Sequence, residues 1–329
     1  MSKNRKISFN INTWLPVIIF VLVALIFGIA TKGNLFTSTN LMNLFNQSVP
    51  TVIAGLGMLF VAAMGSTDIT CGVIVALVGC FGLMVSTNVN PILMIPVSLL
   101  IGIASGLLLG YINAKRKVSS FMASLAMLMA YRAVVNLILS NTSFYLPDSL
   151  EFIDNLAFKI ISVIIMVAII IYIFHYTRFG VYVKDIGENE VAVQHTGINV
   201  DAVKIAAFAV SGFMAAISGI YMVARLGGTN NTIGNGFEMK VMMALFIAGV
   251  PVQGGVGSKV YKLLFGAVII NMLENGLVLC GTSGAVTQFV RGLVLLGAVA
   301  LTAYMSKRFA NVGVEAAHNQ KNTAGQTVK

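Results

Sequence analysis

The sequence predicts an all-α integral membrane protein with about ten transmembrane helices, and three observations lead to this class. Of its 329 residues, 57% are apolar and only 10% are charged, and the mean hydropathy is +0.90. A soluble domain carries roughly 25% charged residues, because its surface must be hydrated. This chain therefore needs lipid as the solvent for its outer surface.

Ten apolar runs define the expected helices, and most of them have the length of a membrane span. At about 1.5 Å per residue, a helix of about 20 residues crosses a hydrocarbon core of roughly 30 Å. The eighth run is too short to cross alone, so it is either a span that tilts into the glycine-rich stretch after it or a broken helix. The runs cover residues 14–30, 46–64, 70–87, 92–112, 119–139, 158–176, 204–224, 239–251, 262–279 and 286–305.

The basic residues predict which side of the membrane each loop occupies. With ten spans and a cytoplasmic N-terminus, fifteen of the 21 Lys and Arg residues lie in or beside cytoplasmic segments, four lie outside and two lie within spans. Cytoplasmic loops of membrane proteins carry this excess. Both termini are therefore expected in the cytoplasm, with the protein in the cell (plasma or inner) membrane. Nine spans plus a re-entrant segment is the alternative.

This topology divides the chain into three parts. Residues 1–13 form a cytoplasmic N-terminal segment, residues 14–305 form the transmembrane domain, and residues 306–329 form a polar cytoplasmic tail that is expected to be disordered. The net charge of +10 is spread over short loops between apolar runs, so it does not predict a nucleic-acid partner. The partner of the outer surface is membrane lipid.

Small residues at four-residue spacing predict close helix contacts. Such residues on one helix face let two backbones approach in lipid. One set is Gly102, Gly106 and Gly110, and the second is Ser211, Ala215 and Gly219.

Four ionisable residues lie in or near the spans, namely Asp68, Arg132, Glu274 and Arg291. A charge at the centre of a span costs about 2.5–3.5 kcal/mol. Arg132 and Glu274 are therefore expected to line a solute pathway or to lock helices around one. Asp68 either lines the pathway or caps a helix with Thr67 or Thr70. Arg291 either belongs to this group or anchors its helix at the interface.

Enzymatic and metal-binding motifs are missing from the sequence. It contains no HExxH and no GxSxG, and its three histidines and three cysteines show no metal-ligand spacing. The stretch Gly254-Gly255-Val256-Gly257-Ser258-Lys259 lacks the residue order of a phosphate-binding loop and predicts a tight turn. The chain is therefore expected to be no enzyme and to bind no cofactor or metal. Uphill transport would draw its energy from a partner or from an ion gradient.

The longest predicted cytoplasmic loop, residues 177–203, has the pattern of a short helix. Glu188 and Glu190 suit a helix start, Gly197 suits its end, and Asn199 or Asp201 can cap the next span. Such a helix is a docking element for a cytoplasmic partner. The alternative is an amphipathic loop that rests on lipid headgroups.

Motifs over roughly residues 35–305 resemble those of permeases from ATP-binding-cassette (ABC) importers of the ribose, xylose, galactose and autoinducer-2 group. The segment 65–72 resembles the family's GGIDLSVG, and Tyr131-Arg132 resembles the arginine of its fifth helix. The remaining matches are Phe36-Thr37, Asn40-Leu41, Gly254-Gly255-Val256-Gly257, Glu274-Asn275-Gly276-Leu277 and, in the cytoplasmic loop, Gly187, Asn189, Ala192, Gly197, Ile198, Asn199 and Val200. Glu274 stands where the family usually has asparagine, and Gln194 and His195 also depart from its pattern.

The resemblance implies the permease subunit of an ATP-powered importer for a small polar solute, a monosaccharide or related sugar. Two such subunits, a second copy or a paralogue, would surround the pathway, and an extracytoplasmic solute-binding protein would deliver the solute. ABC ATPase subunits would use the ATP and grip the cytoplasmic loop. The residues implied in that contact are Glu188, Asn189, Glu190, Ala192, His195 and Gly197, and the candidate pathway residues are Asp68, Arg132, Glu274 and Asn275.

An ion-coupled secondary transporter that uses Asp68 and Glu274 as a relay is the second functional hypothesis. The two hypotheses differ in a measurable way. An ABC permease needs partner subunits, whereas a secondary transporter works alone with a proton or sodium gradient.

Overall fold

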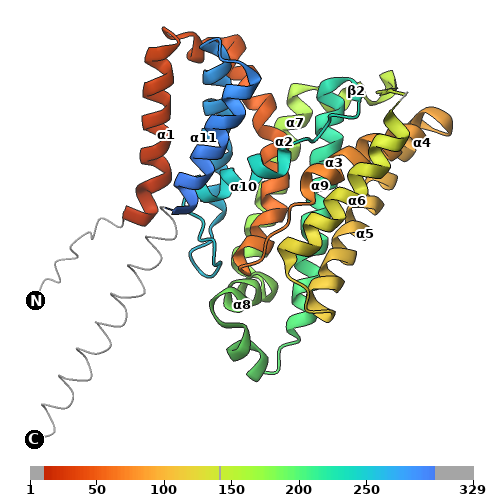
Figure 1. Ribbon diagram of the computed structural model, residues 1–329, viewed down its shortest axis with the longest axis vertical. Helices are drawn as coiled ribbons and strands as arrows, with labels where there is room; N and C mark the ends of the chain where they lie inside the picture. The colour runs from red at the N-terminus through yellow and green to blue at the C-terminus, as the bar shows by residue number, and fades with distance from the viewer. Residues whose placement is uncertain (1–10, 141, 301–329) are drawn as a thin grey trace, which may run out of the picture.

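The computed structural model describes residues 11–140 and 142–300, and these residues form an elongated bundle of helices (Figure 1). Most of the predicted N-terminal segment 1–13 and the whole predicted tail 306–329 lie outside the described residues. Each of the ten apolar runs forms a helix where it is described. The elements are α1 (Ile11–Ala30), α2 (Ser38–Ala63), α3 (Cys71–Leu77), α4 (Leu83–Asn88), α5 (Met94–Lys115), α6 (Ser120–Leu139), β1 (Phe144–Tyr145), α7 (Leu156–Tyr176), α8 (Arg178–His195), α9 (Val200–Leu226), β2 (Gly228–Thr229), α10 (Phe237–Ile247), α11 (Val260–Leu279) and a last helix, Gly284–Ala300.

Seven helical segments in the described part are long and apolar enough to cross a membrane. The all-α membrane class is therefore confirmed. The seven segments are Ser38–Ala63, Cys71–Asn88, Pro91–Lys115, Ser120–Leu139, Leu156–Tyr176, Val200–Leu226 and Val260–Leu279. The apolar parts of the first and last helices, Trp14–Ala30 and Gly284–Ala300, are shorter.

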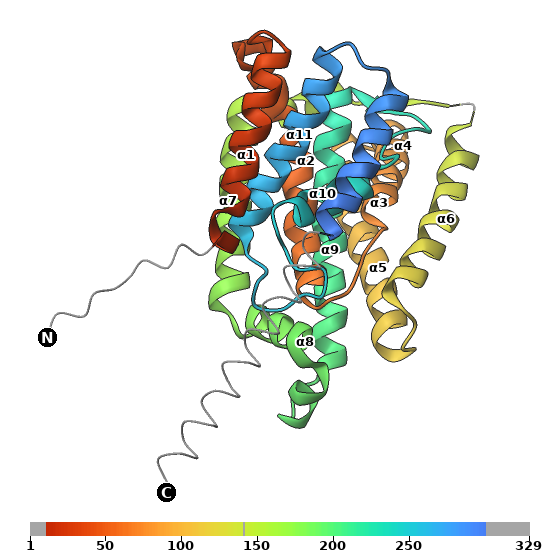
Figure 2. The same ribbon diagram turned by 60° about the vertical axis from the view of Figure 1, so that its left-hand side comes forward.

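The eighth apolar run forms a short helix, which agrees with the broken-helix alternative of the two that the sequence left open. Helix α10 has 11 residues, which gives a length of about 16 Å, half of a hydrocarbon core. Left-handed glycines bound it: Gly236 (φ 70°) precedes the helix and Gly249 (φ 78°) follows it. In Figure 2, α10 lies at half the height of the bundle, surrounded by longer helices.

The helix formed by the third run is also special, because it starts inside the bundle. Residues 66–70 are not helical, and the helix then runs through α3, a π-helical turn (Val78–Gly82) and α4. The start of α3 faces the start of α10, since a Cβ on Gly234 would strike the carbonyl oxygen of Gly72. Two helix N-termini thus meet at half depth.

Helix α9 is the centre of the bundle and packs most extensively against α5 and α2. The predicted small-residue face of α5 lies against α9, and that of α9 lies against α2 and α3. A Cβ on Gly106 would strike the backbone oxygen of Phe208, and a Cβ on Gly212 would strike that of Gly102. Ala215 is buried, and Gly219 packs against Val75. The expectation of close backbone contact is confirmed.

Different loops lie at the two ends of the bundle. Helix α8 lies at one end, which we call the α8 end (Figure 1). The segments predicted to be cytoplasmic meet there: Lys117 contacts Asp201, and Val256 contacts Glu188. At the opposite end, the strand end, β1 pairs antiparallel with β2 through Phe144↔Thr229 and Tyr145↔Gly228.

We predict that Gly106→Leu destabilises the bundle, because the added side chain must separate α5 from α9. The expected loss in the free energy of unfolding is about 1–3 kcal/mol, measured by thermal unfolding of the purified protein in detergent. Gly292→Leu is the matched control, since Gly292 is exposed and a Cβ there meets nothing within 4 Å. If both variants unfold like the parent protein, the close packing of α5 on α9 is contradicted.

Candidate functional site

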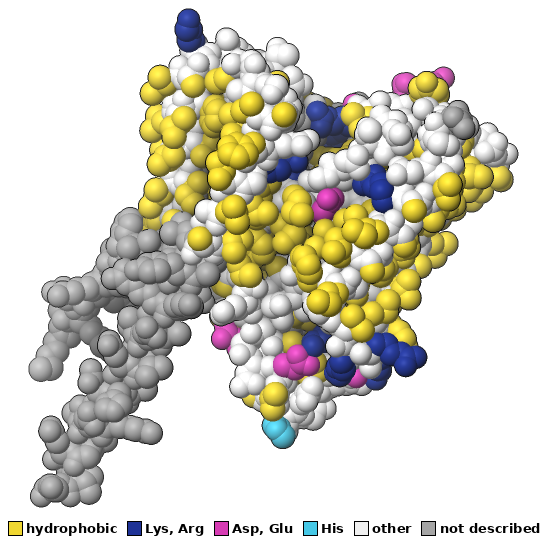
Figure 3. Space-filling view, viewed as in Figure 1, with side chains coloured by type: hydrophobic (Ala, Val, Ile, Leu, Met, Phe, Trp, Pro, Cys, Tyr) yellow, Lys and Arg dark blue, Asp and Glu magenta, His cyan; other side chains and the backbone are white. Residues whose placement is uncertain are grey.

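A hollow with charged side chains opens on one face of the bundle (Figure 3). Glu274 of α11 binds two cations: its Oε2 lies 2.8 Å from Lys240 Nζ, and its Oε1 lies 2.6 Å from Arg291 Nη2. The three side chains come from α10, α11 and the helix Gly284–Ala300. Only 12% of the Glu274 side chain is exposed. The ion pairs therefore lock three helices around the hollow.

The hollow has a volume of about 390 Å³. Polar side chains occupy much of its wall, because the turn between β2 and α10 contributes amides and a hydroxyl. The lining residues are Met222, Leu226, Asn230, Thr232, Ile233, Gly234, Asn235, Gly236, Phe237, Lys240, Glu274 and Arg291. A wall with three charges is poorly solvated by lipid, so this surface calls for water, a polar solute or another protein chain.

Arg132 fixes the turn between β2 and α10, which forms part of the wall of the hollow. Its Nη1 donates a hydrogen bond to the backbone oxygen of Ile233 at 3.0 Å. Glu238, in the first turn of α10, is the opposite charge that acts on Arg132. The Oε2 of Glu238 is buried against Gly72 and has no hydrogen-bond partner among the described residues. Sequence reasoning missed Glu238, although an acidic residue directly before an apolar run is a helix-start signal.

Asp68 binds Thr70, the residue directly before the first turn of α3, and ties it to α9. Its Oδ1 accepts hydrogen bonds from the backbone N–H of Thr70 (2.8 Å) and from the Thr70 hydroxyl (2.6 Å), and its Oδ2 accepts one from the Ser211 hydroxyl (2.7 Å). The side chain is 1% exposed. The structure thus shows the predicted partnership of Asp68 with Thr70, although Thr70 itself is the N-cap residue of α3. Asp68 does not line the hollow.

The structure also shows where Arg291, Lys240 and Asn275 lie. Arg291 does not anchor its helix at an interface, because its guanidinium pairs with Glu274. Lys240 is one of the four basic residues that the predicted topology places outside, together with Lys32, Lys159 and Arg225, but its ammonium pairs with the same carboxylate inside the bundle. Asn275 is half-buried, its Oδ1 has no partner among the described residues, and it does not line the hollow.

Helix α8 consists of two helices that meet at Asn189. The backbone of Asn189 is non-helical (φ −160°, ψ 96°), and its Oδ1 accepts a hydrogen bond from the N–H of Ala192 at 3.0 Å. We call residues 190–195 the α8 tip. Gly197, with φ 81°, follows it, and Asn199 caps α9 by accepting from the N–H of Ala202 at 3.1 Å. A short helix within 177–203 is thus confirmed, and Asn199 provides the following cap.

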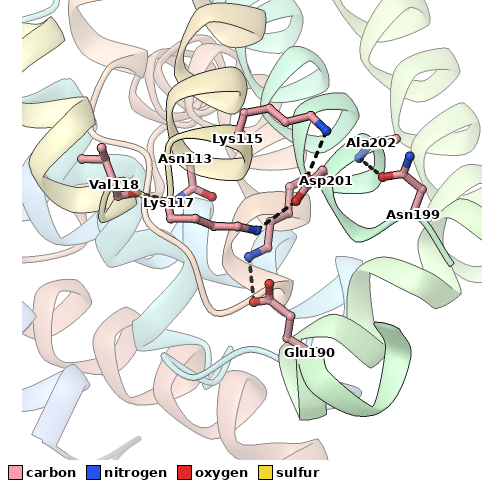
Figure 4. A network of polar contacts seen from close by, with 9 residues as sticks. Asn113, Lys115, Lys117, Val118, Glu190, Asn199, Asp201 and Ala202 are labelled. Carbon is pink, nitrogen blue, oxygen red and sulfur yellow. Dashed lines mark hydrogen bonds and ion pairs between the residues drawn. The ribbon is translucent and has the colours of Figure 1, made fainter. Parts of the chain in front are cut away.

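Ion pairs fix the α8 tip and the start of α9 (Figure 4). Glu190 Oε2 lies 2.7 Å from Lys204 Nζ. Asp201, the other residue considered as a cap, instead receives Lys115 at 3.1 Å and Lys117 at 3.0 Å from the end of α5. Since Lys204 and Asp201 both belong to the first turns of α9, this helix is held to α8 on one side and to α5 on the other.

The glycine-rich turn packs beneath the first half of α8. The backbone N–H of Gly255 donates to the oxygen of Ala63 at 2.8 Å, and Glu188 Oε1 accepts from the N–H of Val256 at 2.9 Å. Gly254 and Gly255 have φ of 82° and 90°, and a Cβ on Gly255 would strike the Glu188 carboxylate. The prediction of a tight turn is therefore confirmed, and the turn joins the end of α2 to α8.

The α8 tip leaves side chains free on the surface. Ala192 and His195 are exposed, and Val191 is 62% exposed, whereas Val193 packs inward. An exposed apolar residue beside polar ones on a fixed helix is a suitable contact for another protein. On the first half of α8, burial lowers the pKa of Lys184, and Asp185 opposes this shift.

The bundle, the hollow and the α8 tip together define an all-α membrane protein with a fixed helix at one end. Comparison with known proteins identifies its family. The chain belongs to the family described as the branched-chain amino acid transport system / permease component, which matches residues 40–299. As a permease component it is a transport subunit, and ATP hydrolysis resides in separate subunits.

Several of the individual relatives are sugar permeases by name. The ribose import permease protein of Escherichia coli K12 is 31% identical over 298 residues, covering 85% of this chain and 90% of the relative. That of Haemophilus influenzae is 31% identical over 324 residues, covering 94% and 99%. The xylose transport system permease protein of E. coli K12 is 27% identical over 372 residues, covering 92% and 94%. No solved structure matches the chain.

We predict that Glu274→Gln destabilises the protein without unfolding it, because Lys240 and Arg291 lose their shared carboxylate. The free energy of unfolding is expected to fall by about 1–3 kcal/mol. Glu190→Gln, which makes the same chemical change in a more exposed pair, is the control and is expected to lose about 0–1 kcal/mol. Equal losses in thermal unfolding would contradict the structural weight of the Glu274 pairs.

Proposed function

We propose that this chain forms the translocation pathway of an ATP-powered importer for a monosaccharide or related sugar. The observation that carries the proposal is the α8 tip: a short helix, capped by Asn189 and paired to α9 through Lys204, at the end of a membrane bundle. A fixed helix that exposes Val191 and His195 suits the docking of an ATPase subunit. The residues of this contact are Glu188, Asn189, Glu190, Ala192, His195 and Gly197.

The sugar class is supported by the relatives and by the chemistry of the hollow. The relatives carry the names of ribose and xylose permeases. The hollow offers donors and acceptors at fixed positions, with Lys240, Glu274 and Arg291 in its wall. Such groups exchange hydrogen bonds with the hydroxyls of a sugar as it passes.

The proposed importer has two further protein partners, one at the strand end and one at the charged hollow. At the strand end, the 3-10 helix Asp148–Asp154 presents Asp148, Glu151 and Asp154 to an extracytoplasmic solute-binding protein. A second copy or a paralogue covers the hollow, which removes its charges from lipid. The chain has ten spans, counting the α10 region as one, lies in the cell membrane and keeps both termini in the cytoplasm.

The test is transport by the purified chain in proteoliposomes. With its ATPase and solute-binding partners, ATP is expected to drive sugar uptake. The chain alone is expected to give no uptake under a proton or sodium gradient, because Asp68 is held by Thr70 and Ser211 and does not line the hollow with Glu274. Gradient-driven uptake by the chain alone would contradict the proposal.

Charge reversal of the α8 tip is expected to uncouple the importer. We predict that Glu190→Lys lowers the amount of sugar transported per ATP while the protein stays inserted, because two facing lysines push the tip away from α9. The measurement is uptake and ATP hydrolysis in the same proteoliposomes. Glu190→Lys combined with Lys204→Glu restores the pair and is expected to recover coupling. Unchanged coupling in the single variant would contradict the docking role.

A labelling experiment tests the topology. Cys280 is exposed and follows α11, at the strand end, whereas Cys71 and Cys80 are buried. We predict that a membrane-impermeant maleimide labels Cys280 in intact cells. In a Cys280→Ser background, Lys117→Cys at the α8 end is expected to be labelled only after the membrane is opened. Labelling of residue 117 in intact cells would reverse the proposed orientation.

A further inference from the structure

The charges that line the hollow do not balance. Lys240 and Arg291 share the single carboxylate of Glu274, so the lining carries one unmatched positive charge. The nearby acids are already engaged. Asp68 is bound by Thr70 and Ser211 at the start of α3, and Glu238, at the start of α10, acts on both Arg132 and Arg291. Even with Glu238 counted, the three cations Lys240, Arg291 and Arg132 meet only two carboxylates. Both acids also lie where a helix N-terminus stabilises negative charge.

From this imbalance we infer that the hollow binds a polyhydroxylated monocarboxylate, a sugar acid, and that Lys240 and Arg291 hold its carboxylate. The inference rests on the proposed function and narrows its substrate class. A second carboxylate would give each cation an acidic partner, which matters in a partly buried site where unpaired charge is costly. A phosphate dianion needs two unmatched positive charges, and the lining provides one.

An unused donor in the wall points to the same ligand. The Nε of Arg291 is buried and has no hydrogen-bond partner among the described residues. Because the Nη2 of Arg291 is already used by Glu274, the Nε–H can donate a single hydrogen bond to one oxygen of the ligand carboxylate. The hydroxyls of the ligand would meet the exposed side chains of Thr232 and Asn235 on the turn before α10.

The size of the hollow suits one sugar acid. Its volume of about 390 Å³ lies near the lower end of the range for small-molecule sites, roughly 300–1,000 Å³. Phe237 adds an aromatic surface at the start of α10. The ligand class thus combines one carboxylate with several hydroxyls on a carbon chain of five or six atoms.

The test is thermal unfolding of the full chain in lipid nanodiscs with sodium D-gluconate, D-ribose or sodium chloride at equal concentrations. We expect gluconate to raise the unfolding temperature in a saturable way, by about 2 °C at a few times its Kd, and ribose and chloride to leave it unchanged. Lys240→Met is expected to abolish this shift. Lys115→Met, which removes a lysine at the α8 end, is the control and is expected to retain it.

The outcomes separate this inference from the proposed function, because the assay requires neither ATP nor partners. An equal shift with ribose, no shift with gluconate, or an unchanged gluconate shift in Lys240→Met would each overturn the sugar-acid assignment. None of these results affects ATP-driven uptake of a sugar, which the proteoliposome experiment measures. A saturable shift with gluconate alone that Lys240→Met removes supports the assignment.

Discussion

Every polar group inside this bundle must find a partner within the protein, because lipid offers none, and helix α9 provides many of these partners. Its Ser211 binds Asp68 in the middle of the bundle, and its Lys204 binds Glu190 at the α8 end. Its small residues let α5 approach to backbone contact, with Gly212 of α9 against Gly102 of α5. The broken third segment can start at half depth only because Asp68 is satisfied there. The position of α3, and with it the space opposite α10, depends on this one helix.

The same helix connects the two regions to which we assign function. It begins directly after the α8 tip, at Val200, and ends at Leu226, where β2 and the turn before α10 lead to the hollow. A packed helix moves as a unit, because its core contacts do not deform continuously. Movement of the α8 tip by an ATPase would therefore shift α9 and, through it, the wall of the hollow. Helix α9 is also tied to α2, since the backbone oxygen of Pro50 accepts a hydrogen bond from Ser218 at 2.8 Å.

Much of the fold could be predicted because hydropathy and loop charge report directly on contact with lipid. The helices, the tight turn at 254–259, the short helix in 177–203 and the glycine contacts followed from local patterns. The position of Lys240 could not be predicted, because the length of a short apolar run does not tell how deep in the bundle that run lies. The pairs that Glu274 makes with Lys240 and Arg291 join three helices, so they depend on packing that no spacing reveals. Asp68 remained ambiguous for a related reason: its partner Ser211 is distant in sequence.

The central claim is that the charged hollow is an aqueous pathway and not a surface in contact with lipid. Thiol reactivity tests it most directly, because a thiol reacts as the thiolate, which forms in water. Single cysteines at Asn235, in the wall of the hollow, and at Ile164, 62% exposed on α7, would be compared in a protein whose native cysteines are serine. The account predicts rapid modification of Asn235→Cys by a water-soluble reagent and little modification of Ile164→Cys. Equally slow modification at both positions would contradict it.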